Sequence, residues 1–242
     1  MMIKKGILIC LLPVIMISCF TEENWDAGKE VTRRINLESY QAIEINSVFD
    51  ILLVQDTADY ALVTCGTNLM DNIRIEQSGD RVQLSQNTGM NWARIYKRVV
   101  IELHFKTLTA IQINKSSFIE TKKTVQSPEL FIKDNSPVSE TDINIDCTDF
   151  HLSVERDNFG IYTVEGTAKN CSLELDGSAH FKTGNLVSDS CYVNHKGIGD
   201  CFVNAKRVLS GIIVRTGSLM YYYYPTLKME IENVNGKIIR LN

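Results

Sequence analysis

The feature that most constrains the fold of this chain is a short repeat in its second half, with a period of about 20 residues. Gly177, Gly197 and Gly217 recur at this spacing, and Gly236 follows one position early. Apolar residues stand four positions before the first three glycines: Leu173, Val193 and Ile213. So short a repeat has little interior of its own and must stack on its neighbours to bury apolar surface. We therefore expect a solenoid with one coil per repeat, in which these three apolar residues form one interior column.

Within the repeats, apolar and polar residues alternate, as they do in strands with one buried face. The same alternation predicts earlier strands at residues 43–45, 49–54, 60–64 and 99–105. Residues 73–76 and 82–84 predict a β-hairpin, because Gly79 between them supplies the positive φ that tight turns often need. The alternative is a β-sandwich with similar turn spacing. Sandwich strands, however, do not keep small, apolar and glycine positions in phase, so the sequence favours an all-β solenoid.

Residues 1–18 have the layout of an export signal. Lys4 and Lys5 give a basic start, and residues 6–17 are almost all apolar but too few to span a bilayer. Residues 16–19 (Met-Ile-Ser-Cys) resemble a bacterial lipobox, although Met16 and Ile17 depart from the usual Leu-Ala/Ser. We predict a lipoprotein signal peptide over residues 1–18, acylation of Cys19, and a flexible anchor linker over residues 19–34. The alternative is ordinary cleavage and free secretion.

Charge and cysteine content exclude several classes of protein. Removal of the signal leaves 23 basic and 29 acidic residues, a net charge of −6 with no basic cluster, which argues against nucleic acid. The remaining cysteines show no paired C-x-x-C, and the sequence predicts no cofactor and no metal. Cys191, His195 and Cys201 match no common zinc spacing, and the two cysteines are interpreted as small core residues. Cys171 and Cys191 should lie on neighbouring coils, where either a disulfide or a reduced pair fits.

Several segments together resemble one known family. They are the lipobox, Phe-Asp-Ile at 49–51, Gly-Thr-Asn-Leu-Met-Asp-Asn-Ile at 66–73, the hairpin through Gly79, Thr-Gly-Ser at 216–218 and Tyr-Tyr-Pro at 223–225. This pattern is similar to the head-GIN-domain family, described as auto-transporter adhesins and common as lipoproteins of gut Bacteroidetes. The resemblance covers about residues 35–242. It implies a right-handed parallel β-helix-like solenoid over that range, with an N-terminal segment containing the hairpin, and an exported location, but it carries over no catalytic residue.

The candidate ligand-binding residues are exposed aromatic residues. If Phe181, Cys201 and Tyr221 face inward, alternation also turns Tyr223 inward and directs their neighbours outward in two columns. The first column is Lys182, Phe202 and Tyr222; the second is Gly184, Asn204 and Tyr224. Such a surface could bind sugar rings or a protein, and Trp92 in a polar loop is a further candidate. Alternatively, Phe202 and Tyr222 pack beneath residues 229–241.

These patterns predict a non-enzymatic binding or adhesion module for glycan or protein ligands of the host or the envelope. It would be lipid-anchored to the outer membrane, with no other contact with the membrane. A carbohydrate-active β-helix enzyme, either a polysaccharide lyase or a hydrolase, is one alternative, with Asp142 and Asp146 as its two carboxylates. Those residues flank apolar ones on a single coil and fit a solvated strand face better. A structural envelope protein is a third possibility.

Overall fold

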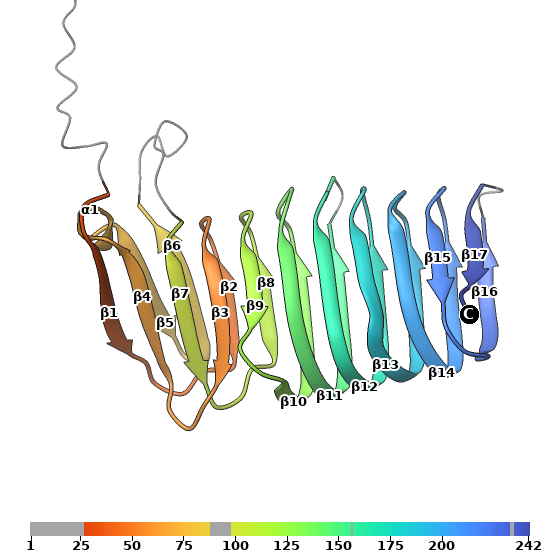
Figure 1. The fold of residues 1–242 in the computed structure, drawn as a ribbon, viewed down its shortest axis with the longest axis horizontal. Helices are drawn as coiled ribbons and strands as arrows, with labels where there is room; N and C mark the ends of the chain where they lie inside the picture. Colours follow the sequence, from red (N-terminus) through yellow and green to blue (C-terminus); the bar gives the residue numbers. More distant parts are fainter. Residues whose placement is uncertain (1–26, 88–97, 156, 233–234) are drawn as a thin grey trace, which may run out of the picture.

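The structure is a computed structural model that describes residues 27–87, 98–155, 157–232 and 235–242. It is nearly all β, a parallel solenoid of about six turns that runs from β1 at one end to β16 and β17 at the other (Figure 1). The expected fold class is thus confirmed. The strands are β1 (Glu30–Asn36), β2 (Ala42–Ile45), β3 (Asp50–Gln55), β4 (Tyr60–Gly66), β5 (Ile73–Ser78), β6 (Arg81–Gln86), β7 (Val100–Phe105), β8 (Ala110–Ile113), β9 (Phe118–Thr121), β10 (Val125–Asp134), β11 (Glu140–Val154), β12 (Ile161–Leu175), β13 (His180–His195), β14 (Asp200–Ile213), β15 (Ser218–Tyr221), β16 (Thr226–Ile231) and β17 (Lys237–Arg240). One short helix, α1 (Thr67–Met70), follows β4.

Each long strand bends around the solenoid, so different parts of it belong to different faces. The first face contains β7, β3 and β9, then the beginnings of β11 to β14, and finally β15 and β17. The second face contains β6, β2, β8 and the end of β10, then the ends of β11 to β14, and finally β16. The beginning of β10 and the middles of β11 to β14 form a third ladder between them. Strands distant in sequence thereby become neighbours, which lets one surface site draw residues from several coils.

The interior consists of stacked apolar columns, but the expected register holds only in part. Leu173 lies beside Val193, as predicted. Val193, however, lies beside Gly211, and Ile213 lies beside His195, so the predicted third member of the column is wrong. The spacing between equivalent residues falls from 20 to 18 here, because the register of β13 and β14 shifts twice at the bend of β13. The first shift lies between Lys182 and Val187, and the second between Ser188 and Ser190. A shift of two residues keeps the same side chains facing the core.

The N-terminal end is capped by antiparallel pairing. β1 pairs with β4, and β4 pairs with β7. The predicted hairpin is present as β5 and β6, with Gly79 at φ +60° in its turn. β1 begins at Glu30, inside the range predicted as a flexible linker over residues 19–34. Its side chains are mostly exposed and polar, so the apolar alternation that marks a strand is missing from its sequence.

The C-terminal end has a different construction. Among the described residues, β16 pairs with β14 alone and β17 with β15 alone, so each strand has one unpaired edge. No helix among these residues has the length and apolar character needed to cross a membrane.

Candidate functional site

The main candidate site is a groove on the first face near the C-terminal end. Its larger part, about 610 Å³, is lined by Gly184, Asn185, Asn204, Tyr222, Tyr223, Tyr224, Arg240, Leu241 and Asn242. A smaller part of about 330 Å³ is lined by Thr163, Lys182, Gly184, Asn185, Phe202 and Tyr222. The two parts share Gly184, Asn185 and Tyr222, and we call them together the aromatic groove. Their volumes lie in the range of small-ligand sites.

Five separate segments supply the groove, the first of them β12 through Thr163. β13 contributes Gly184, β14 contributes Phe202 and Asn204, the turn after β15 contributes the tyrosines, and β17 contributes Arg240. Phe202 lies beside Lys182 as expected, but the next residue in that column is Met220, not Tyr222. The two-residue shortening of the coil causes this difference. Tyr222 instead reaches across to Gly184, where an added Cβ would lie 2.9 Å from its Cε2 atom.

The tyrosine run does not continue the strand alternation. Tyr221 is buried at the end of β15, and Tyr223 was expected to face inward too. That expectation is wrong, because Tyr223 adopts φ +64° and is exposed. The turn that it makes leaves Tyr224 81% exposed, with the Arg240 guanidinium 4.3 Å above its ring centre. A cation in this position restricts the ring while leaving part of it open to a ligand.

Asn204 supplies polar chemistry next to these rings. Its Nδ2 donates to the Gly184 carbonyl at 3.0 Å, which fixes the side chain. Its Oδ1 is shielded from solvent and, within the described part of the chain, has no hydrogen-bond partner. A shielded acceptor without a donor costs about 1–3 kcal/mol. A ligand donor that reached this oxygen would recover that free energy.

The C-terminal segment borders the aromatic groove more than it covers it. Phe202 and Tyr222 are half-buried, and Arg240, Leu241 and Asn242 form part of the lining. The groove thus brings together four of the candidates predicted from sequence, namely Phe202, Asn204, Tyr222 and Tyr224. Two further predicted positions, the acylation site Cys19 and the candidate Trp92, lie outside the described residues.

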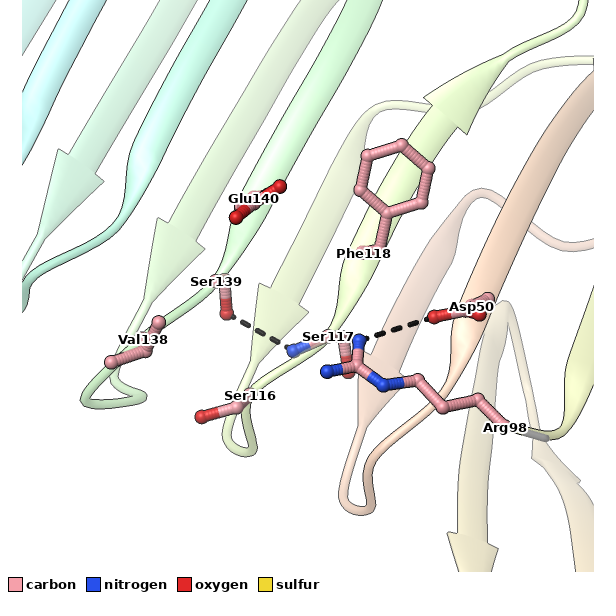
Figure 2. Close-up of a pocket in the computed structure, with 8 residues that line it drawn as sticks. All are labelled: Asp50, Arg98, Ser116, Ser117, Phe118, Val138, Ser139 and Glu140. Carbon is pink, nitrogen blue, oxygen red and sulfur yellow. Dashed lines mark hydrogen bonds and ion pairs between the residues drawn. The ribbon is translucent and has the colours of Figure 1, made fainter. Parts of the chain in front are cut away.

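A second cavity, of about 330 Å³, lies at a corner of the coils between β3, β9 and β11 (Figure 2). Its entrance carries an ion pair between Arg98 and Asp50 at 3.2 Å. The Ser117 N–H donates to Ser139 Oγ at 3.3 Å, and the Ser117 hydroxyl already bonds to backbone carbonyls. These groups hold the corners of neighbouring coils together. Of the shielded polar side-chain atoms that lack a partner among the described residues, none belongs to the lining of this cavity, whereas Asn204 Oδ1 belongs to that of the aromatic groove.

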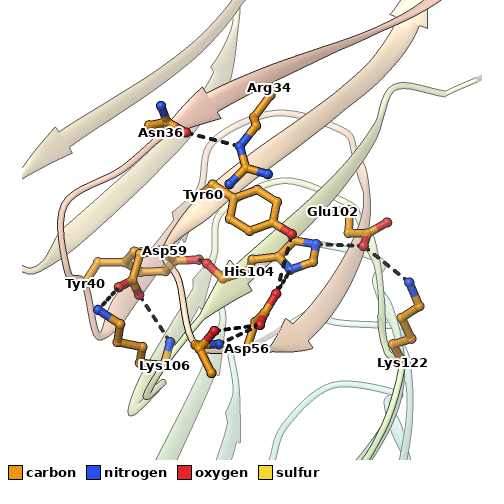
Figure 3. A network of polar contacts seen from close by, with 11 residues as sticks. Arg34, Asn36, Tyr40, Asp56, Asp59, Tyr60, Glu102, His104, Lys106 and Lys122 are labelled. Atoms are coloured by element: carbon orange, nitrogen blue, oxygen red, sulfur yellow. Dashed lines mark hydrogen bonds and ion pairs between the residues drawn. The ribbon is translucent and has the colours of Figure 1, made fainter.

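A polar network surrounds His104, to which no pattern in the sequence pointed (Figure 3). Nδ1 of His104 lies 2.9 Å from Asp56 and Nε2 lies 2.7 Å from Glu102. The Tyr60 ring stacks on the imidazole, and Arg34 covers Tyr60 from the other side. A backbone hydrogen bond from Thr57 and then the bond with His104 lower the pKa of Asp56. Both imidazole nitrogens are engaged, so the network joins the N-terminal strands and leaves no nitrogen for a ligand.

The remaining candidates lie apart from the groove. Asp142 and Asp146 are exposed, and Asp146 accepts a hydrogen bond from Thr167 at 2.7 Å. His195 is fully buried with Nε2 2.9 Å from the Gly199 carbonyl. Cys171 and Cys191 are register neighbours, and both are free and buried. Burial also raises the pKa of the Cys201 thiol.

Comparisons with known proteins place these features in context. A family model described as "Putative auto-transporter adhesin, head GIN domain" matches residues 39–225. A solved "putative adhesin" from Bacteroides fragilis NCTC 9343 is 21% identical with a TM-score of 0.81, over 88% of this chain and 97% of that one. A second, from Parabacteroides merdae ATCC 43184, is 14% identical with a TM-score of 0.67, over 89% and 97%. A "putative lipid binding protein" from Parabacteroides distasonis ATCC 8503 is 19% identical with a TM-score of 0.61, over 89% and 98%. These likenesses establish the fold. A search among curated proteins found no match.

Proposed function

The chain belongs to the head GIN domain family of "putative auto-transporter adhesins", and on that premise we propose that it is a cell-envelope lipoprotein whose aromatic groove binds glycans without catalysis. The observation that carries the proposal is the convergence of Tyr222 and Tyr224 on one groove with the amide of Asn204. Tyrosine faces offer flat apolar contact to sugar rings, and amides bond to hydroxyl groups.

The polar lining favours a glycan over an apolar ligand. Asn185, Asn204 and Arg240 border the larger part of the groove, and Lys182 borders the smaller part. A lipid chain would offer no donor to Asn204 Oδ1 and would displace water from the charged groups of Lys182 and Arg240, and both effects are costly. We therefore do not propose for this groove the lipid binding that the name of the Parabacteroides distasonis structure gives. A protein ligand that presents an amphipathic loop remains the second candidate, because tyrosine and arginine are also frequent in protein interfaces.

The location of the groove agrees with anchoring at Cys19. β1 begins at Glu30, eleven positions after that cysteine, at the end of the solenoid opposite to the groove (Figure 1). An acylated Cys19 would hold the N-terminal end near the outer membrane. The groove would then face away from the membrane, where a ligand can reach it.

Binding to an immobilised panel of mucin O-glycans, glycosaminoglycans and plant polysaccharides tests the proposal. Tyr222→Ala and Tyr224→Ala should each weaken binding about tenfold, since a lost ring contact costs about 0.5–1.5 kcal/mol beyond the lost area. Tyr192→Ala is the matched control, because Tyr192 is 45% exposed on the second face. Gly184→Ala provides a variant that keeps every ring but displaces that of Tyr222.

Three outcomes would contradict the proposal. One is that no glycan in the panel binds to the wild-type chain. A second is that Tyr192→Ala weakens binding as much as Tyr222→Ala does. The third is product release from a polysaccharide that disappears in Asp142→Asn or Asp146→Asn, which would identify an enzyme acting elsewhere on the solenoid.

A further inference from the structure

The last coil exposes a strand edge that the rest of the described chain leaves unpaired. β16 pairs with the end of β14, from Val208–Thr226 to Ile213–Ile231. Its other edge has no strand beside it within the described ranges. Unpaired edges of this kind are templates for pairing with another strand.

The backbone groups at this free edge can be identified from the register. The N–H of Glu232 donates to the Ile213 carbonyl, so it points toward β14. Because successive residues of a strand direct their N–H and C=O groups to opposite edges, those of Lys228 and Glu230 point the same way. The N–H and C=O groups of Leu227, Met229 and Ile231 therefore point to the free edge.

The side chains at this edge divide into two sets. Leu227, Met229 and Ile231 continue the interior columns of Leu209, Gly211 and Ile213. No further coil covers them among the described residues, and Leu227 and Ile231 are 44% and 46% exposed. Lys228 and Glu230 lie between them and point outward. The edge thus combines open hydrogen-bonding groups, uncovered apolar side chains and two charges of opposite sign.

We propose that β16 pairs antiparallel with β16 of a second copy of this chain, in the register that places Met229 opposite Met229. That register also places Leu227 of each copy opposite Ile231 of the other. The three residues with free backbone groups in one copy therefore face the same three residues in the other. Antiparallel residues that face each other in this way exchange two hydrogen bonds per pair, about six in total. The uncovered interior columns of both copies then continue across the junction.

Charge complementarity selects a second copy over an unrelated strand. In this register Lys228 of each copy lies opposite Glu230 of the other, which gives two opposite-charge pairs on the outer face. Opposite charges that face each other across strands stabilise pairing, and like charges oppose it. The contact is self-complementary, so it closes as a two-fold dimer and does not extend into a fibre.

The geometry of the dimer determines where the membranes of its two copies lie, an inference that rests on the proposed anchor at Cys19. A two-fold axis perpendicular to the second face reverses the direction of the solenoid, so the two N-terminal ends lie at opposite ends of the dimer. Two anchored copies that pair in this way belong to two facing membranes. The pairing is then a homophilic bridge between cells or vesicles.

Sedimentation equilibrium of the full chain in detergent tests the dimer without reference to the anchor. The wild-type chain should dimerise, while Lys228→Glu and Glu230→Lys should each weaken dimerisation at least about tenfold, because each creates two like-charge pairs. An equimolar mixture of the two variants should recover the dimer. Positions 228 and 230 are both acidic in Lys228→Glu and both basic in Glu230→Lys, so opposite charges face each other again. Lys206→Glu on the exposed bend of β14 is the matched control for a reversed lysine. Circular dichroism of each variant should match that of the wild type.

Vesicles that carry the full acylated chain test the bridge. Wild-type vesicles should aggregate, and vesicles with a single variant should aggregate only when the two variants are mixed. A wild-type chain that stays monomeric at high micromolar concentration, a dimer that ignores both reversals, or growth into longer head-to-tail rods would overturn the proposed pairing. Dimers in solution without aggregation of vesicles would keep the pairing and overturn the anchor at the N-terminal end.

Discussion

Removing one hydroxyl group from the buried Tyr162 should destabilise the solenoid more than removing one from the equally buried Tyr40. The Tyr162 hydroxyl donates to Asp134 Oδ2 at 2.6 Å and accepts a hydrogen bond from Asn158 at 2.8 Å. Asp134 is fully buried, and its Oδ1 accepts from the Ser136 N–H at 2.7 Å. The Tyr40 hydroxyl donates to a neutral acceptor, the His104 carbonyl, at 3.0 Å.

The expected magnitudes follow from the acceptors. Tyr162→Phe leaves one oxygen of a buried carboxylate without its donor, and a hydrogen bond to a charged group contributes about 1.5–3 kcal/mol. With the lost bond from Asn158, the decrease in the free energy of unfolding should be about 3 kcal/mol. Tyr40→Phe should lower it by about 1 kcal/mol. The substituted ring would keep the edge-to-face contact that Tyr162 makes with Phe181 at 5.3 Å, so packing should change little.

Urea unfolding followed by circular dichroism measures both variants. In a chain of this size, about 1 kcal/mol shifts the melting temperature by about 2–4 °C, so thermal melts should separate the variants clearly. Adding Asp134→Asn to Tyr162→Phe removes the unpaired charge and should cost less than the two single losses combined. Equal destabilisation by Tyr162→Phe and Tyr40→Phe would refute the reasoning, because the charge of the acceptor would then be irrelevant.

Two further predictions concern the backbone and pH. Gly166→Ala should lower the melting temperature far more than Gly79→Ala. Gly166 has φ +110°, and a Cβ added there would lie 2.0 Å from the Ile145 carbonyl oxygen, whereas the space around Gly79 is open. Similar decreases in melting temperature for the two variants would show that the bend of the strand adapts to the added Cβ. Burial lowers the pKa of His195, so the unfolded chain binds more protons than the folded one below about pH 6.5. The stability contributed by neutral His195 is therefore complete above that pH and decreases as the pH falls toward the lowered pKa. The urea midpoint of His195→Gln should consequently change less between pH 7.5 and pH 5 than that of the wild type, and parallel pH profiles would contradict this assignment.

The candidate site shows which parts of a solenoid surface can be predicted from sequence. Phe202 and Lys182 were placed side by side correctly, because alternation and the repeat spacing both hold up to the beginning of β14. Tyr222 was assigned to the wrong column and Tyr223 to the wrong face. The first error follows from the shortened coil and the second from a turn that starts right after Tyr221. Tyr222 and Tyr224 reach the groove through that turn, which the repeat pattern does not describe.

The sequence by itself determined which side chains within the strands face the core and that short coils must stack, because both depend only on the alternation and the approximate period of apolar residues. Only the tertiary structure decided which residues lie side by side in the last coils. A slip of two residues leaves every inward side chain inward, so the hydrophobic pattern carries no information about it. Two register shifts at the bend of β13, between Lys182 and Val187 and between Ser188 and Ser190, together produce that slip. The contacts of His104, the composition of the aromatic groove and the open edge of β16 likewise depend on segments that are distant in sequence and meet only when the coils are stacked.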